Sequence, residues 1–547
     1  MNRASLGLPG LLFAMLTSAC GGTAPTAVAT CPAPHSRDKP RGSEAREASA
    51  TDRLALFDAI VLEVHTHHQF SDAAFARRYR LEEHPGLARE RWDADLPHFR
   101  RLFEEASDQE ALVRALVQLN ESLLDGHCHF TPLSLPPARL LPLSFRPLLD
   151  GAYERFVVTS SRVEGIEPGD ELVSFDGVAA SELLAHEAFR TASTNLRRRA
   201  EHIAAALPQG LITTPTTQTE VHVAVRHAGT VVEREVSFAP ASREVSYAST
   251  DAPMPAPHCP AGDIDYGHGY GLASTGRKFC LYTSSDAAYR DLPIVRYFSF
   301  MYADQDAMGV IAADHDHLDQ ALSRAHAAAP LRGLVLDLRE NRGGVNPYFF
   351  QDFFTTRPYP HHIIEVPLSA SLSPSRIESL MGPEEAAAYQ ARLQALTPSE
   401  APSWRFPFLA PPEALHAPHT PVRTLEVVQA GTPVAVLTGF TCASSCDTVA
   451  SWFARGQLGP VIGEEPALAF TTLRLPIEIA ADGWGPLGTF RIAFSRETLG
   501  FDGETVEGRT YPIHAVPETE ENHAVYSARL IDEASSALPA RTPSGRR

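Results

Sequence analysis

The stretch PVAVLTGFTCASSCDTVASWFARGQLGPVIGEE, residues 433–465, carries the strongest structural signal in the chain. Val434–Leu437 is an apolar run with valine at alternate positions, which predicts a buried strand. The small residues of Thr441–Cys446 predict a tight turn, and Thr448–Ala454 predicts a short helix. Val461-Ile462 predicts a second strand. The stretch therefore indicates a strand, a turn and a helix in immediate succession.

Ser444 lies inside this turn and is a candidate nucleophile. A turn between a strand and a helix exposes a serine hydroxyl, and the free N–H groups at the helix start can bind a developing oxyanion. The alternative is structural, because Ser444-x-x-Asp447 also has the spacing of a capping box. Ser445 is a competing serine. Evidence from elsewhere in the chain has to decide between these interpretations.

The composition favours a soluble globular protein that does not bind nucleic acid. The chain has 547 residues and a net charge of −19, with 44% hydrophobic and 21% charged residues. A phosphate backbone selects clustered Lys and Arg, and no basic stripe is present. Lysine occurs only at Lys39 and Lys278. The length suggests about three domains.

The N-terminus predicts export. Residues 1–19 combine a positive charge, an apolar core and small residues before Cys20, which resembles a bacterial lipoprotein signal peptide with Cys20 as the lipidated residue. Ordinary secretion is the alternative. Residues 20–50 predict a flexible tether. We expect a protein of the cell envelope, periplasmic or on the outer surface, that contacts the membrane only through the lipid at Cys20.

Export makes disulfides chemically permitted. Cys259 with Cys280 would close a loop, and Cys442 with Cys446 would brace the turn; free buried thiols are the alternative. The His and Cys pairs along the chain are too scattered for a zinc site. We therefore expect no metal and no cofactor.

Residues 51–240 predict two smaller domains. Residues 51–135 show helical periodicity and predict an N-terminal helical domain. We expect His65, His67 and His68, at the end of its first helix, to lie on a solvated or capping face. Residues 136–240 predict short strands. Within them GIEPGDELVSFDGV, residues 165–178, resembles the carboxyl half of a PDZ domain, which binds peptides by adding a strand to a sheet edge. A generic hairpin is the alternative.

The second half of the chain predicts a larger α/β domain. Residues 241–290 predict a linker or surface loop, and residues 291–535 alternate strands with helices. Leu331–Arg339 predicts a buried strand that leads into a loop ending in Gly343-Gly344, where positive φ and close backbone approach are allowed. An insertion is expected at about 355–425, and a flexible tail at 536–547.

Four segments in this order resemble one family, the C-terminal processing peptidases and the tricorn core. GLVLDLRENRGG (333–344) is similar to the family's strand and glycine loop, and CASSCDTVASWF (442–453) occupies the place of its nucleophile turn. VIGEE (461–465) resembles the strand behind that turn, and VEGRTYPI (506–513) resembles the segment that carries a late acid. The resemblance implies a multidomain α/β serine peptidase with a crotonase/ClpP-like ββα core and favours Ser444 as nucleophile.

The general base separates two branches of that family. One branch uses a lysine beyond the serine, but no lysine follows Lys278 in this chain. The tricorn-like branch uses a histidine before the PDZ region, and His127 matches that position. An acid near the C-terminus orients the histidine, with Glu507 as the best match and Glu504 as the alternative.

The resemblance then implies a complete mechanism. His127 would accept the proton of Ser444 during attack on a peptide carbonyl and return it to the leaving amine, while Glu507 would hold the imidazole. The oxyanion donors would be backbone N–H groups of Ser445 and of Gly343 or Gly344. The alternative function is a non-catalytic lipoprotein on the same scaffold that binds a peptide or a hydrophobic ligand.

Overall fold

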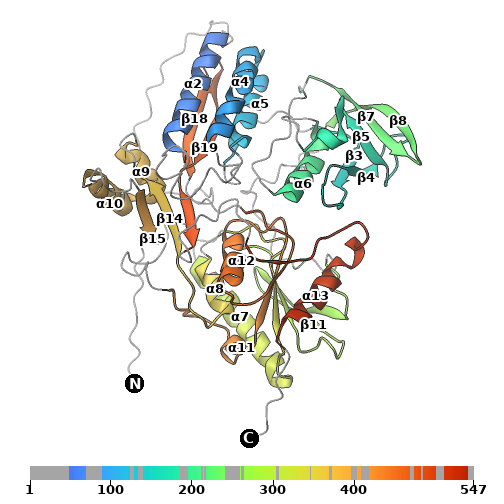
Figure 1. The fold of residues 1–547 in the computed structure, drawn as a ribbon, viewed down its shortest axis with the longest axis vertical. Helices are drawn as coiled ribbons and strands as arrows, with labels where there is room; N and C mark the ends of the chain where they lie inside the picture. Colours follow the sequence, from blue (N-terminus) through green and yellow to red (C-terminus); the bar gives the residue numbers. More distant parts are fainter. Residues whose placement is uncertain are drawn as a thin grey trace.

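The structure is a computed structural model that describes most residues of the chain. These are residues 48–68, 89–123, 128–133, 139–184, 195–210, 214, 217–240, 259, 264–302, 307–344, 347–368, 372–395, 403–407, 418–468, 474–481, 484–499 and 511–539. Cys20, His127, Glu504 and Glu507 lie outside them, as do the predicted signal peptide and almost all of the predicted tether and tail. Within these residues the protein is a multidomain α/β structure (Figure 1).

A seven-stranded sheet forms the centre of the largest unit. Its strands, in spatial order, are β10 (Tyr270–Thr275), β11 (Phe279–Ser284), β12 (Ile294–Tyr297), β13 (Leu334–Asp337), β16 (Val434–Thr438), β17 (Val461–Gly463) and β21 (His514–Ala515). Strands β12 to β21 are parallel, whereas β10 and β11 are antiparallel to their neighbours. The parallel strands β12, β13, β16 and β17 are buried on both faces, as the interior of such a sheet requires, whereas both residues of the edge strand β21 are exposed.

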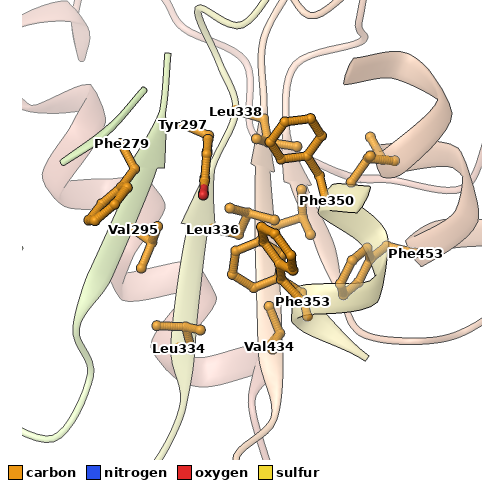
Figure 2. Close-up of a cluster of buried hydrophobic side chains, with 14 of the residues drawn as sticks. Phe279, Val295, Tyr297, Leu334, Leu336, Leu338, Phe350, Phe353, Val434 and Phe453 are labelled. Carbon is orange, nitrogen blue, oxygen red and sulfur yellow. The ribbon is translucent and has the colours of Figure 1, made fainter. Parts of the chain in front are cut away.

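Alternate residues of each strand face opposite layers of helices. Leu334, Leu336 and Val434 face one layer, and Val335 and Ala435 face the other. The first layer consists of α7 (Ala307–Ala328), α8 (Tyr348–Phe354) and α12 (Ser445–Arg455), with the short α11 (Glu426–Gln429) beside α7. The second layer contains α13 (Tyr526–Ala537). Figure 2 shows the aromatic side chains of α8 and α12 packed on the first face of the sheet.

The α/β pattern predicted from the sequence is confirmed here, with one correction. The expected strand at 434–437 is β16, and the expected helix at 448–454 is α12. The linker expected at 241–290 is wrong for residues 270–284, because β10 and β11 extend the core sheet there. All six residues of β10 are exposed or half-exposed, so the strand lacks the apolar alternation that predicts a strand.

The parallel strands bring three loops to one edge of the sheet. The segments that follow β13, β16 and β17 begin at the carboxyl ends of neighbouring strands. Open α/β sheets bind their ligands at this edge. The loop of Gly343-Gly344 and the turn of Ser444 are therefore neighbours, although a hundred residues separate them in the sequence.

The β-rich unit is an antiparallel sheet with one packed helix. Its strands are β3 (Leu143–Pro147), β4 (Phe156–Ser161), β5 (Glu171–Phe175), β6 (Val178–Ala179), β7 (Glu220–His227) and β8 (Thr230–Ser237), and the helix is α6 (Leu196–Ala206). The expected turn after β5 is present: Asp176 and Gly177 both have positive φ, as a tight hairpin turn requires. The remaining short pair, β2 (Arg139–Leu140) and β9 (Ala239–Pro240), joins the two ends of this unit.

The N-terminal helices share their core with later parts of the chain. The helices are α2 (Ala50–His67), α4 (Arg89–Glu105) and α5 (Gln109–Glu121). Their apolar faces pack against β1 (Phe130–Pro132), β18 (Arg474–Ala481), β19 (Gly485–Ala493), β14 (His362–Pro367), α9 (Pro374–Met381) and α10 (Pro383–Gln394). Strands β15 (Ser403–Pro407) and β20 (Arg496–Leu499) flank β14. Strand β14, helices α9 and α10 and the β18–β19 hairpin thus complete the helical region, which does not bury its apolar faces alone (Figure 1).

The three histidines at the end of α2 do not form a solvated face. His67 and His68 are buried, and only His65 is partly exposed, where its Nε2 lies 2.6 Å from Asp93 Oδ1. Burial, with the nearby Arg91, lowers the pKa of His68 to about 3. The prediction of a solvated face is therefore wrong for His67 and His68, because the C-terminal end of α2 packs inward, whereas the capping interpretation holds for His68, which is the C-cap residue of α2.

The β-rich unit contacts the core through the start of α6. Asn195 Nδ2 donates to the carbonyl oxygens of Glu465 and Pro466, each at 2.9 Å. The buried guanidinium of Arg197 pairs with Glu464 and, at 2.6 Å, with Glu518. These acidic residues lie on the segments that follow β17 and β21. The β-rich unit is therefore attached beside the turn that holds Ser444.

Candidate active site

Ser444 has an unusual backbone conformation at the start of α12. Its φ is 57° and its ψ is −128°, a combination that L-residues rarely adopt. Strand β16 runs into the turn and α12 leaves it, so the serine lies at a sharp strand-to-helix bend. The same strained bend presents the nucleophile of α/β hydrolases. Such strain at a non-glycine residue is typical of functional positions.

The capping interpretation of Ser444 is wrong. Ser444 occupies the N-cap position of α12, but its side chain makes no capping hydrogen bond. Asp447, the other residue of the predicted capping box, is fully buried and accepts a hydrogen bond from the Tyr511 hydroxyl at 3.2 Å. Burial, together with the Asp447 carboxylate, raises the pKa of Tyr511 far above its usual value, so the phenol stays protonated.

The two neighbouring serines differ in what their hydroxyls do. Ser445 is buried, and its Oγ donates to the Gly344 carbonyl oxygen at 3.1 Å. Ser444 is partly exposed, and its hydroxyl bonds to none of the residues that the structure describes. The competing serine is therefore committed to a structural bond, whereas Ser444 has its hydroxyl available.

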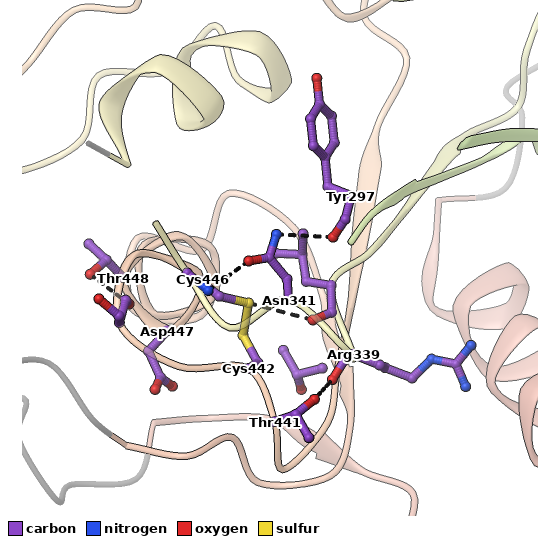
Figure 3. The surroundings of a disulfide bond; sticks show 12 residues. Tyr297, Arg339, Asn341, Thr441, Cys442, Cys446, Asp447 and Thr448 are labelled. Atoms are coloured by element: carbon purple, nitrogen blue, oxygen red, sulfur yellow. Dashed lines mark hydrogen bonds between the residues drawn. A yellow bond between two sulfur atoms is a disulfide. The ribbon is translucent and has the colours of Figure 1, made fainter. Parts of the chain in front are cut away.

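Hydrogen bonds join the turn of residues 441–446, here called the nucleophile turn after its candidate nucleophile Ser444, to the glycine loop of residues 339–344 (Figure 3). The Thr441 hydroxyl donates to the Arg339 carbonyl oxygen, and the Ala443 N–H donates to the Asn341 carbonyl oxygen at 3.3 Å. Asn341 is fully buried and anchors the loop from within: its Nδ2 donates to the Tyr297 carbonyl oxygen at 3.0 Å. The turn and the loop are thus held as one assembly at the edge of the sheet.

Both glycines of the loop are required by space and by conformation. Gly343 has a φ of +85°, and a Cβ there would lie 2.5 Å from the Ala443 oxygen and 2.7 Å from the Ser444 Cβ. Gly344 has a φ of +146°, and its Cβ would lie 2.1 Å from the Phe300 carbonyl carbon. Only glycine permits this approach, so the loop backbone lies directly against the candidate nucleophile.

The candidate oxyanion donors differ in whether their N–H groups are already hydrogen-bonded. The Gly343 N–H donates to Asn341 Oδ1 at 2.8 Å and is already engaged. Among the described residues, the N–H groups of Gly344 and Ser445 have no hydrogen-bond acceptor. The Gly343 N–H is therefore not available in this conformation, and Gly344 with Ser445 remains as the pair that can receive an oxyanion.

Both cysteine pairs suggested by the sequence are joined. Cys442 is bonded to Cys446 across the nucleophile turn, and Cys259 to Cys280 of β11. The remaining cysteine of the described part of the chain, Cys128, is buried, and its Sγ accepts from the Ala493 N–H at 3.1 Å. Also within that part, no group of three or more His, Cys, Asp or Glu residues is arranged to hold a metal ion.

The remaining members of the predicted relay, His127 and Glu507, lie outside the described residues. Their neighbours are placed. Cys128 is buried in the core that the N-terminal helices share with β19. Tyr511 bonds to Asp447 on α12, which brings the chain back to the helix of the nucleophile turn four residues after Glu507.

Residues 294–485 match the family model described as peptidase family S41. These residues belong to peptidase family S41. The match spans β12 to the start of β19 and includes both the glycine loop and the nucleophile turn. The S41 domain is that of a serine-type peptidase, so the family and the enzyme class inferred from the sequence are confirmed, and its substrates are proteins or peptides.

Solved structures share the fold over most of the chain. The structure of mature CPAF complexed with lactacystin aligns with a TM-score of 0.61 at 14% identity and covers 89% of this chain and 98% of that chain. The crystal structure of mature CPAF aligns with a TM-score of 0.60 at 14% identity, covering 89% and 96%. Likeness at these identities shows a shared fold alone. No curated protein matches the sequence significantly.

The sequence did not reveal the roles of two residues, Asn341 and Arg197. Asn341 belongs to the glycine-loop motif, and its buried side chain holds both the loop and the Gly343 N–H. A buried-strand prediction followed by Asn-x-Gly-Gly is the signal that could have identified it as an anchor. Arg197 gave no signal, because the two carboxylates to which it hydrogen-bonds, those of Glu464 and Glu518, lie 267 and 321 residues away in the sequence.

Proposed function

We propose that this protein is an exported serine endopeptidase in which Ser444 is the nucleophile and His127 the general base. His127 takes the Ser444 proton as Oγ attacks the peptide carbonyl, and the N–H groups of Gly344 and Ser445 stabilise the oxyanion. His127 then protonates the leaving amine as the C–N bond breaks. Water hydrolyses the acyl-enzyme by the reverse proton transfers, and Glu507 orients the imidazole throughout.

One observation carries this proposal: the strained backbone of Ser444 beside a loop that only glycine can form. Ser444 has a φ of 57°, and a Cβ at Gly343 would lie 2.7 Å from the Ser444 Cβ, so the serine lies against a loop whose Gly344 N–H has no acceptor among the described residues. A serine with a purely structural role would not need either feature. The S41 match over the same residues supports the same chemistry.

Labelling with a fluorophosphonate probe, followed by peptide mapping, tests the nucleophile. We expect modification at Ser444 in the wild type, none in Ser444→Ala, and a rate reduced by at least about 10³-fold in His127→Ala, because removing either member of such a relay has effects of this size. Ser445→Ala is the matched control and should label at nearly the wild-type rate. Modification at Ser445, or equal labelling of Ser444→Ala, would overturn the assignment.

We also propose that residues 136–240 are a PDZ-like module that docks extended peptides, and that the core is crotonase/ClpP-like. The antiparallel sheet with its single packed helix supports the first likeness, and β8 lies at an open edge with most of its side chains exposed. A peptide can add to such an edge through main-chain bonds. Substituting Val231→Asp on β8 should then raise the KM for long peptides and leave that for short peptides unchanged; equal effects on both would exclude docking there.

The lipid anchor at Cys20 is also part of the proposal, and the resemblance of residues 1–19 to a lipoprotein signal peptide supports it. Within the described residues, no helix is long and apolar enough to cross a membrane. Expression of the full chain with Cys20→Ser tests the anchor. The wild type should partition with detergent-solubilised membranes, and the variant should appear in the aqueous phase. A wild type that is also aqueous would favour ordinary secretion.

A further inference from the structure

The Cys442–Cys446 disulfide encloses the candidate nucleophile. Its two cysteines flank the three residues Ala443, Ser444 and Ser445, and their Cα atoms are held 5.3 Å apart. Both side chains are fully buried in the apolar core formed with α8 and α12. Five residues that were free to extend could separate these Cα atoms by about 13 Å. The bond therefore prevents the turn from opening.

The enclosed backbone is held at both ends by the rest of the fold. The Cys442 N–H donates to the Gly439 oxygen at 2.9 Å, and the Cys442 oxygen accepts from the Ala467 N–H at 2.8 Å. At the other end, the Cys446 N–H donates to the Ala443 oxygen at 3.1 Å, and the Cys446 Sγ contacts the Leu338 carbonyl oxygen at 3.5 Å. Between these anchors Ser444 keeps its positive φ.

A positive φ at serine is a conformation that the surroundings must impose. Relaxation of Ser444 to an ordinary conformation would rotate the peptide that joins it to Ser445. That rotation would move both the Ser444 hydroxyl and the Ser445 N–H, which are the groups that the proposed reaction needs in fixed positions. A covalent link between residues two before and two after the serine opposes such a rotation directly.

We infer that the Cys442–Cys446 disulfide is a positioning element for catalysis, which keeps Ser444 and the Ser445 N–H in their reactive arrangement. The inference rests on the proposed function. It predicts that loss of the disulfide slows acylation while substrate binding is retained, because positioning of the nucleophile affects kcat rather than KM.

The second disulfide provides a matched control. Cys259–Cys280 closes a longer loop, with a sequence separation of 21 against 4, and joins residue 259 to β11 in the core on the α13 side of the sheet. In the chain-entropy view, a longer loop contributes more stability. The Cys259→Ser/Cys280→Ser variant should therefore lose more thermal stability than Cys442→Ser/Cys446→Ser, yet keep its activity.

The experiment compares these two double variants with the full-length wild type. Fluorophosphonate acylation rates, kcat and KM are measured at a temperature where circular dichroism shows all three folded. We expect acylation and kcat to fall at least 10-fold in Cys442→Ser/Cys446→Ser, with KM within about twofold, and no change in the control pair. If burial of two hydroxyls prevents folding, Cys442→Ala/Cys446→Ala replaces that variant.

The outcomes separate this inference from the proposed function. A wild type that does not label at Ser444 removes the proposed function itself. A wild type that labels, with a folded 442/446 variant that labels equally fast, overturns the positioning role. Activity losses that simply follow the losses of stability in both variants would also overturn it, because the bond would then act only on the unfolded chain.

Discussion

The glycine loop after β13 and the nucleophile turn after β16 lie beside each other at one edge of the core sheet, yet their backbones are held in different ways. The loop reaches positive φ with glycine at 343 and 344 and is anchored by the buried side chain of Asn341. The turn reaches positive φ at Ser444, where the proposed reaction needs a side chain, and is closed by a disulfide. Glycine adopts positive φ without a steric penalty, whereas serine does not, and in our proposal the disulfide keeps the serine in that conformation.

The largest effect should come from adding a methyl group to the loop. Gly343→Ala places a Cβ 2.5 Å from the Ala443 oxygen, so the loop and the turn must separate. We expect kcat/KM to fall at least about 100-fold, as when an oxyanion-hole donor is removed. Gly431→Ala is the control: φ is +93°, but its Cβ would meet nothing within 4 Å, so only roughly 1–2 kcal/mol of stability should be lost. Comparable losses of activity in the two variants would contradict the contact argument.

A smaller effect should follow from removing the anchor of the loop. Asn341→Ala leaves the Tyr297 carbonyl and the Gly343 N–H without their partners in a fully buried site. Each such group costs about 1–3 kcal/mol, so we expect about 2–4 kcal/mol of lost unfolding free energy by urea denaturation. Asn522→Ala is the matched control.

Asn522 makes the same pair of bonds as Asn341 in a more exposed place. Its Nδ2 donates to the Pro517 oxygen at 3.0 Å, and its Oδ1 accepts from the Thr519 N–H at 2.8 Å. Water can replace these bonds, so its substitution should cost about 1 kcal/mol. Equal costs at Asn341 and Asn522 would show that burial of the anchor is not what stabilises the loop.

A still smaller effect is expected at the bond that joins the two regions through Ser445. Ser445→Ala removes the hydrogen bond to the Gly344 oxygen, worth about 1 kcal/mol, and leaves the Ser445 N–H in place. Activity should stay within a few-fold of the wild type. A loss as large as that of Ser444→Ala would mean that Ser445 takes part in the chemistry.

The smallest effect is expected at Thr441. Its hydroxyl bonds to the Arg339 oxygen from a half-buried position that water can reach, so Thr441→Val should cost about 0.5–1 kcal/mol of stability with activity retained. Thr441→Ser keeps the hydroxyl and should behave as the wild type in the same denaturation measurement. A larger cost for Thr441→Val than for Asn341→Ala would reverse the order of the two anchors.

Local sequence patterns were enough to predict the elements of the core, but they did not predict the contacts between distant segments. Apolar runs and a closing glycine indicate strands β13 and β16 and helix α12, because burial on both faces requires apolar residues throughout a strand. The φ of Ser444 leaves no such mark, since it results from contacts with a loop a hundred residues earlier. The exposed strand β10 and the core that α2 shares with β18 were not predicted either, because neither leaves a local pattern in the sequence.

In the candidate active site, too, the local sequence predicts some features and only the folded structure determines the others. Ser444 and the two glycines could be proposed from spacing and small size, but only coordinates show that the Gly343 N–H is taken by Asn341. The choice between Ser444 and Ser445 likewise needed the bond from Ser445 to Gly344. Sequence identifies the residue types that a reaction needs; the assignment of each hydrogen bond depends on the packed neighbours.

The position of α13 and of the β10–β11 pair has a practical consequence for anyone who divides this chain. The S41 match ends at residue 485 and begins at 294, so it leaves out the strand that pairs with β12, the strand that pairs with β17 and the helix that covers Val335 and Ala435. A fragment cut at those limits would present two bare sheet edges and an uncovered apolar face, and we expect it to aggregate. A fragment intended for expression or crystallisation must therefore extend at least from Tyr266 to Leu538, and it also needs the N-terminal helices α2, α4 and α5, whose apolar faces share a core with β14, α9, α10 and the β18–β19 hairpin of that range.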